Sequence, residues 1–157
     1  IISKTAALLS ACTACGARSV TDDAETILLM KDFGENIGIA FQIRDDLLDY
    51  EGTGLTGKTA GNDIKEKKIT LPLIHALEQS ENSKRRHILS IVKNKKKTKS
   101  EINEVISFVA DYGGMDYAEL KMNQYRDKAL AILDTYPESE VKESLREFVH
   151  YTTSRKK

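Results

Sequence analysis

The stretch TDDAETILLMKDFGENIGIAFQIRDDLLDYEG, residues 21–52, predicts one long helix and decides the fold class. Its apolar residues recur at the spacing of a buried helical stripe. They are Ile27, Met30, Ile37, Phe41 and Leu48. Gly34 and Gly38 lie inside the helix, where each costs about 1 kcal/mol relative to alanine. We expect close packing against a neighbouring helix to offset that cost.

Helical periodicity also dominates the rest of the chain, and no convincing strand alternation appears. We therefore predict an all-α helical bundle, or part of one. The first helix runs to about Arg18 and begins without a capping residue, which indicates a helix entered midway. Thr70 is expected to cap a short helix that carries Pro72 in its first turn. Further helices are predicted over 83–93, 99–112 and 114–134, and from about 137 onward.

The composition describes a soluble globular protein. Of 157 residues, 40% are hydrophobic and 31% charged, and the formal net charge is zero. We therefore expect no nucleic-acid partner, and no stable membrane insertion, since residues 5–17 form too short and polar a stretch. Cys12 and Cys15 have the CxxC spacing of a redox pair or half a zinc site, but no second Cys/His pair follows. We predict buried, unpaired thiols and a cytoplasmic location.

Acidic residues crowd the end of the long helix, at Asp45, Asp46, Asp49 and Glu51. Like charges at i, i+4 destabilise a helix by about 0.2–0.5 kcal/mol per pair. The helix dipole disfavours each anion at a C-terminus by about 0.3–1 kcal/mol more. A solvated helix end paired with Arg44 is one interpretation. The apolar flanks favour another, a hard cation such as Mg²⁺, because the cluster offers only oxygen ligands.

A basic stretch follows, GKTAGNDIKEKKITLP at residues 57–72. Asp63 and the lysines of this stretch suit a metal–diphosphate complex, in which carboxylates hold the metal and ammonium groups neutralise phosphate. The stretch is not a P-loop, because the GxxxxGK[ST] spacing is absent. The sequence therefore predicts a site for Mg²⁺ and a diphosphate.

Several segments, in order, resemble the trans-isoprenyl diphosphate synthases of the polyprenyl synthetase family. They are KTAALL at 4–9, GIAFQIRDDLLDY at 38–50 and GKTAGNDIKEKKITLPLI at 57–74, with a looser fit of DYGGMDYA at 111–118 and YPES at 136–139. The resemblance implies the all-α isoprenoid synthase (terpenoid synthase) helical bundle. It also implies a prenyltransferase of isoprenoid biosynthesis. Such an enzyme condenses isopentenyl diphosphate with an allylic diphosphate, giving a longer all-trans polyprenyl diphosphate and diphosphate.

The resemblance also assigns site residues. Asp45, Asp46 and Asp49, in the DDLLD sequence, match the second aspartate-rich motif, and Asp63 matches the later acid that supports the metal cluster. Asp45 is expected to bind Mg²⁺ directly, and the other three directly or through water. The lysines that match those contacting the allylic diphosphate are Lys4, Lys58 and Lys68. Thr5 and Gln42 match the polar residues whose oxygens face the developing cation. Lys65 and Lys67 do not match the motif lysine and are expected at the surface.

The family carries two aspartate-rich motifs on facing helices, and this chain shows one. The chain is therefore expected to be the C-terminal half of a single synthase domain. Residues 1–80 would hold the active-site helices and the loop, and residues 81–157 the peripheral helices. Several Mg²⁺ ions would be shared with carboxylates of the missing N-terminal half, and a homodimer is expected. We expect the chain alone not to catalyse condensation.

Two alternatives remain, a non-catalytic regulatory subunit of a heteromeric prenyl synthase and a terpene cyclase. The intact aspartates weigh against the first, and the KTAALL and GNDIKEKKITLP segments against the second.

Residues 84–99 hold eight basic side chains and no acid. Because no aromatic residue lies among them to stack bases, we expect a solvated linker. The terminal Ser154–Lys157 segment is predicted to be an untethered end.

Overall fold

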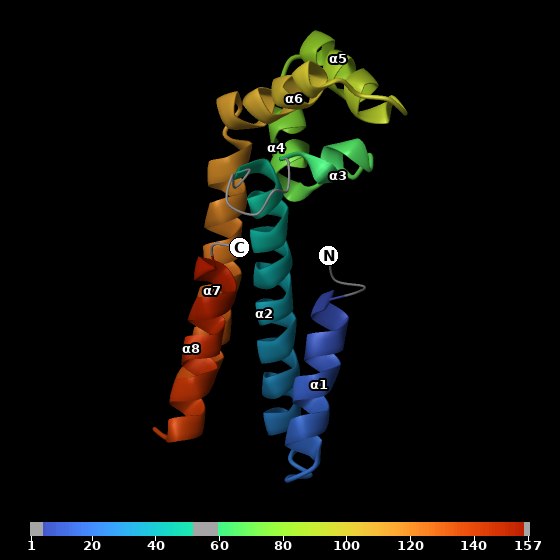
Figure 1. Ribbon diagram of the computed structural model, residues 1–157. Coiled ribbons are helices and arrows are strands. Elements are labelled where there is room, and N and C mark those ends of the chain that lie inside the picture. Colours follow the sequence, from blue (N-terminus) through green and yellow to red (C-terminus); the bar gives the residue numbers. More distant parts are fainter. Residues whose placement is uncertain (1–4, 52–59, 156–157) are drawn as a thin grey trace. The chain divides into compact units, whose positions relative to one another are not determined.

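The computed structural model describes residues 5–51 and 60–155, and in these ranges all regular structure is helical (Figure 1). The predicted all-α fold is confirmed. The helices are α1 (Ala7–Arg18), α2 (Ala24–Glu51), α3 (Asn62–Lys65), α4 (Leu71–Gln79), α5 (Asn82–Lys93), α6 (Lys99–Asp111), α7 (Gly114–Asp134) and α8 (Glu140–Ser154). Among these described helices, none combines the length and the apolar character that a membrane crossing would need.

The chain divides into two compact units. Of the described residues, unit 1 comprises 5–44 and 120–155, and unit 2 comprises 45–51 and 60–119. Helices α2 and α7 each contribute to both units. The assignment of the whole chain to one synthase domain stays a prediction.

The core of unit 1 joins α2, α7 and α8. Their buried side chains form one apolar cluster, against which Leu9 of α1 also packs. Its fully buried members are Phe33, Ile37, Ala129, Leu133 and Val149. Of the expected stripe of α2, Ile37 is buried in this cluster and Met30 packs against it, whereas Phe33, also buried here, was not part of the predicted stripe.

The glycines of α2 bring α1 very close, as the adjacent ribbons in Figure 1 show. A Cβ added to Gly38 would lie 2.4 Å from Cα of Ala6, and one added to Gly34 would lie 2.5 Å from the carbonyl oxygen of Leu9. Neither position has room for a side chain. The expected packing of these glycines against a neighbouring helix is confirmed.

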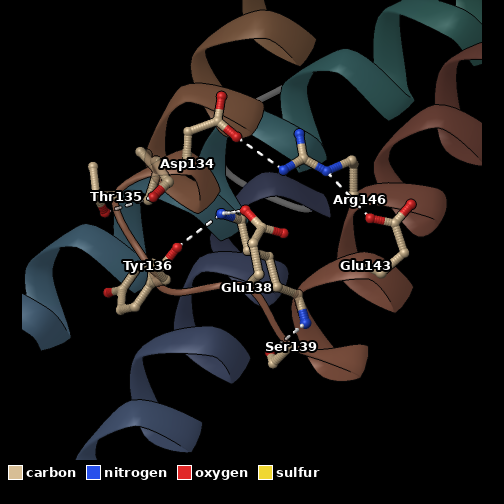
Figure 2. A network of polar contacts seen from close by, with 9 residues as sticks. Asp134, Thr135, Tyr136, Glu138, Ser139, Glu143 and Arg146 are labelled. Atoms are coloured by element: carbon tan, nitrogen blue, oxygen red, sulfur yellow. Dashed lines mark hydrogen bonds and ion pairs between the residues drawn. The ribbon is translucent and has the colours of Figure 1, made fainter.

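A polar network fixes the turn between α7 and α8 (Figure 2). The Lys142 side chain is only 5% exposed, and its Nζ donates to the carbonyl oxygen of Tyr136 at 2.7 Å and to Oε1 of Glu138 at 2.6 Å. Arg146 pairs with Asp134 at 3.0 Å. The buried ammonium is therefore satisfied by a carboxylate and a carbonyl, as a buried charge must be.

Unit 2 has its own core, formed mainly by α4, α5 and α6. The buried residues on these helices recur every three or four positions and meet in one cluster. They are Leu73, Ala76, Leu77, Ile88, Ile91, Val92, Ile102, Val105, Phe108 and Val109. Tyr50 of α2 and Ile64 of α3 join the same cluster, so the segments that carry the acidic and basic motifs rest on this core.

The prediction that the two cysteines are buried is wrong, since Cys12 and Cys15 are both exposed. Helix α1 approaches α2 through Ala6 and Leu9, and the cysteines fall on another face of α1. Small residues occur on more than one face of this helix, so composition alone does not indicate the buried face.

Candidate active site

Asp49, in the last turns of α2, is anchored to the segment that begins α3. Its Oδ1 accepts a hydrogen bond from the backbone N–H of Asn62 at 3.1 Å, and its Oδ2 accepts one from that of Asp63 at 3.0 Å. Its backbone carbonyl accepts from the N–H of Gly61 at 2.9 Å. Three bonds thus tie the end of α2 to the start of α3 and bring Asp49 and Asp63 together.

Gly61 makes this connection possible. It precedes α3 with φ of 80°, a left-handed conformation that is easy only for glycine. A Cβ at this position would also lie 2.5 Å from Cγ2 of Ile102. The local backbone therefore requires glycine twice, for conformation and for space.

Tyr50, next to Asp49, is buried and shares a hydrogen bond of 3.1 Å with the hydroxyl of Thr70. Burial is the main cause that raises the pKa of Tyr50, and the negative charges of Asp49, Asp63 and Asp46 raise it further. The phenol therefore stays neutral. Thr70 lies at the N-cap of α4, but its side chain makes no capping hydrogen bond, so the predicted side-chain cap is wrong. Pro72 does lie in the first turn, as predicted.

Lys68 is paired with carboxylates. Its Nζ lies 2.8 Å from Oε2 of Glu66 and 3.1 Å from Oδ1 of Asp63. The hydrogen bond to Glu66 and then that to Asp63 raise the pKa of Lys68, so the ammonium is charged at neutral pH. Because the Lys68 side chain is 57% exposed, its ion pairs are screened by water and easily exchanged for another anion.

The adjacent aspartates of the DDLLD motif have different surroundings. Asp45 is exposed, whereas Asp46 is only 6% exposed. In the described ranges no three His, Cys, Asp or Glu side chains are grouped so as to hold a metal ion. The donor set is nevertheless made of carboxylate oxygens, which fits Mg²⁺, an ion that commonly takes one or two carboxylates and completes its shell with substrate phosphates and water.

Thr5 and Gln42, the expected neighbours of the cation, meet in unit 1. The hydroxyl of Thr5 donates to Oε1 of Gln42 at 3.2 Å, and both side chains are half-buried. Two electron-rich oxygens are thereby held side by side. Their role toward a cation stays a prediction.

The predicted site residues thus fall into two sets, one in each unit. Asp49, Asp63 and Lys68 are brought together in unit 2. The pair of Thr5 and Gln42 forms in unit 1. Lys4 and Lys58 lie outside the described residues. Sequence inspection missed Gly61 and Tyr50, and for Gly61 a signal was present, a glycine directly before the polar start of a helix.

The prediction of an untethered C-terminal end is wrong for Arg155. Its carbonyl oxygen accepts hydrogen bonds from Nε and Nη2 of Arg44 at 3.1 and 3.0 Å. Its guanidinium lies over the ring of Phe41, 4.1 Å from the centroid. The end of α8 is therefore fastened to α2 through the residue that precedes Asp45.

We expect the Asp49→Asn variant to lower the free energy of unfolding by about 2 kcal/mol in metal-free buffer, since hydrogen bonds to a charged acceptor contribute more than neutral ones. An amide group also places an N–H₂ against one of the two backbone donors. Urea denaturation measures the change. Asp32→Asn, at an exposed position of the same helix, is the matched control and should change stability by less than about 0.5 kcal/mol. Equal stability of both variants would contradict the anchoring role of Asp49.

Solved structures place this chain in a fold class. Geranylgeranyl pyrophosphate synthase from Bacteroides thetaiotaomicron matches it with a TM-score of 0.89 and 38% identity, over 98% of this chain and 51% of that one. Polyprenyl synthase from Caulobacter crescentus, solved with calcium and isoprenyl diphosphate, matches with a TM-score of 0.86 and 33% identity, over 99% and 48%. The chain has the all-α terpenoid synthase fold.

Sequence comparison identifies the family. The profile of the polyprenyl synthetase family matches residues 1–109, and the chain belongs to this family. Geranylfarnesyl diphosphate synthase from Aeropyrum pernix is 35% identical over 157 residues, which cover 98% of this chain and 48% of that protein. The chain spans about half the length of the curated relatives it matches.

Proposed function

We propose that this chain supplies the second aspartate-rich half of a trans-prenyltransferase active site. The reaction is the condensation of isopentenyl diphosphate with an allylic diphosphate, giving a longer all-trans polyprenyl diphosphate and diphosphate. The observation that carries the proposal is the arrangement of Asp49, Asp63 and Lys68 in a chain of the polyprenyl synthetase family. It combines anchored carboxylates with an exchangeable ammonium.

The carboxylates would hold the metal. Asp45, which is exposed, would bind the ion directly, and Asp46, Asp49 and Asp63 would bind directly or through water. Bound Mg²⁺ neutralises negative charge on the diphosphate leaving group. The relative from Caulobacter crescentus, solved with calcium and isoprenyl diphosphate, supports a divalent cation of this kind. The family carries a further aspartate-rich motif, and we assign its carboxylates to an N-terminal half that would share the metal ions.

The remaining residues would bind the substrate and orient it. Lys68 would exchange Glu66 and Asp63 for phosphate oxygens, joined by Lys4 and Lys58. The oxygens of Thr5 and Gln42, fixed by their mutual hydrogen bond, would face the allylic carbon as positive charge develops. Preorganised dipoles of this kind stabilise charge without reorganising during the reaction. We also propose that the complete subunits form a homodimer in the cytoplasm.

Condensation assays test the proposal. With Mg²⁺, isopentenyl diphosphate and an allylic diphosphate, we expect the complete protein to elongate the allylic chain and the isolated 157 residues to give no product above background. Omitting isopentenyl diphosphate should abolish products of the complete protein. Cyclised hydrocarbons formed without isopentenyl diphosphate would indicate a terpene cyclase. Activity of the isolated chain would refute the need for a second set of carboxylates.

A further inference from the structure

Two cavities of unit 2 are lined largely by lysines. The first, of about 450 Å³, is lined by Lys65, Lys95, Lys96 and Lys97. The second, of about 410 Å³, shares Lys65 and Lys97 and adds Lys99. The other lining residues of the second cavity are Ala60, Ile102 and Asn103. The shared lysines show that the two spaces adjoin, at the meeting of α3 with the linker between α5 and α6.

The linker that carries these lysines is anchored. Nζ of Lys97 donates to the carbonyl oxygen of Asn94 at 2.8 Å and to that of Lys65 at 3.5 Å. Thr98 and Glu101 form a reciprocal capping box that starts α6. The linker is solvated at Lys95 and Lys96, as predicted, whereas Lys97 is half-buried and bonds to α3 through the carbonyl oxygen of Lys65.

Three of these lysines contribute charge that no described group offsets by direct contact. In the described parts of the chain, the side chains of Lys95, Lys96 and Lys99 form neither an ion pair nor a hydrogen bond. Burial, followed by repulsion from Lys67, lowers the pKa of Lys97. The nearby acid, Glu101, is engaged by the backbone and hydroxyl of Thr98 in the capping box. An anion that entered the cavities would relieve this repulsion.

We propose that these adjoining cavities form a binding site for a phosphate-bearing anion. Lysine ammonium groups are strong point-charge donors to phosphate oxygens. The positive end of the α6 dipole lies beside them, at Lys99. Both spaces are open at the surface, because most of the lysines that line them are exposed. Among the described residues that line the cavities none is aromatic, which argues against stacked nucleic-acid bases.

The site would be separate from the proposed reaction. None of its lining residues matches a metal or diphosphate ligand of the family motifs, and Lys65 was expected to be a plain surface residue. Two sources offer the required chemistry, a soluble phosphate or diphosphate and the phosphate of a lipid headgroup. The cavities would accept either, so the test must present both.

Titration of the chain with inorganic diphosphate in EDTA tests the proposal, because removing divalent cations disfavours the Mg²⁺-dependent site. Two-dimensional ¹H–¹⁵N spectra should show shifts at residues 94–99. The double variant Lys96→Gln/Lys99→Gln should weaken the affinity about tenfold, the effect of losing two charge-assisted contacts in water. Neither side chain makes a structural contact, so the variant should fold. Lys31→Gln/Lys93→Gln removes the same charge from positions outside the cavities and should change the affinity less than about twofold.

A second arm distinguishes the sources. Cosedimentation with phosphatidylglycerol vesicles, against phosphatidylcholine vesicles, reports a lipid phosphate. Binding of free diphosphate that depends on Lys96 and Lys99 supports a soluble ligand, and vesicle binding with that dependence supports a headgroup. The proposal is overturned if neither diphosphate nor vesicles bind. It is also overturned if the two double variants lose affinity equally.

Discussion

The Asp45→Ala variant of the complete protein is expected to lower kcat for condensation by about 10²–10³-fold, the cost of removing one preorganised electrostatic group from an active site. Asp45 is exposed, and substitutions at exposed positions usually change the free energy of unfolding by less than about 0.5 kcal/mol. The expected result therefore separates function from stability. Steady-state kinetics at saturating Mg²⁺, together with urea denaturation, measure both quantities.

Asp32→Ala is the matched control for this experiment. Asp32 is also an exposed aspartate of α2, but it lies outside the acidic cluster at the end of the helix. Its loss should leave kcat within about twofold of the wild-type value, since only long-range screened charge is removed. If Asp45→Ala keeps full activity, or if Asp32→Ala loses as much, the assignment of Asp45 to the metal is wrong.

Gly38→Ala is expected to produce the largest loss of stability, about 1–3 kcal/mol, because the added methyl group would overpack the contact between α1 and α2. The new Cβ would lie 2.4 Å from Cα of Ala6, a backbone atom that cannot rotate away. Thr5 precedes Ala6, and Gln42 follows Gly38 by one helical turn. The hydrogen bond between Thr5 and Gln42 should therefore also be disturbed, and kcat of the complete protein should fall with stability.

Gly16→Ala provides the control within α1. A Cβ at Gly16 would meet nothing within 4 Å. Because alanine favours the helix over glycine by about 1 kcal/mol, this variant should be as stable as the wild type or more stable. Thermal denaturation of the two variants side by side measures the contrast. Equal behaviour would show that the close approach at Gly38 is not what positions α1.

Much of the fold follows from local patterns. The helices predicted over 83–93, 99–112 and 114–134 are observed at Asn82–Lys93, Lys99–Asp111 and Gly114–Asp134. Periodicity and breakers such as Gly113, which has φ of 68°, act within a few residues and so are visible in a sequence. The glycines of α2 were informative for a related reason. A glycine inside a helix lowers the stability of that helix, which indicates a compensating close contact but does not identify the segment that makes it.

The candidate site could be predicted only in part from such local patterns. Residue types and their order pointed to Asp45, Asp49, Asp63 and Lys68, because oxygen ligands and ammonium groups have recognisable chemistry. The arrangement of these residues in space could not be predicted from the sequence. The anchoring of Asp49 by the first amides of α3 depends on the left-handed turn at Gly61 and on its close contact with Ile102, from a helix far along the chain.

The sequence by itself determined the helices, the family and the chemistry of the acidic and basic motifs, since these depend on short-range periodicity and on residue type. Tertiary structure decided which side chains are buried and which meet. It exposed Cys12 and Cys15, buried Asp46 beside an exposed Asp45, and placed Lys97 of the linker against Lys65. Such outcomes depend on how helix faces pack across long separations in the chain, which no local pattern contains.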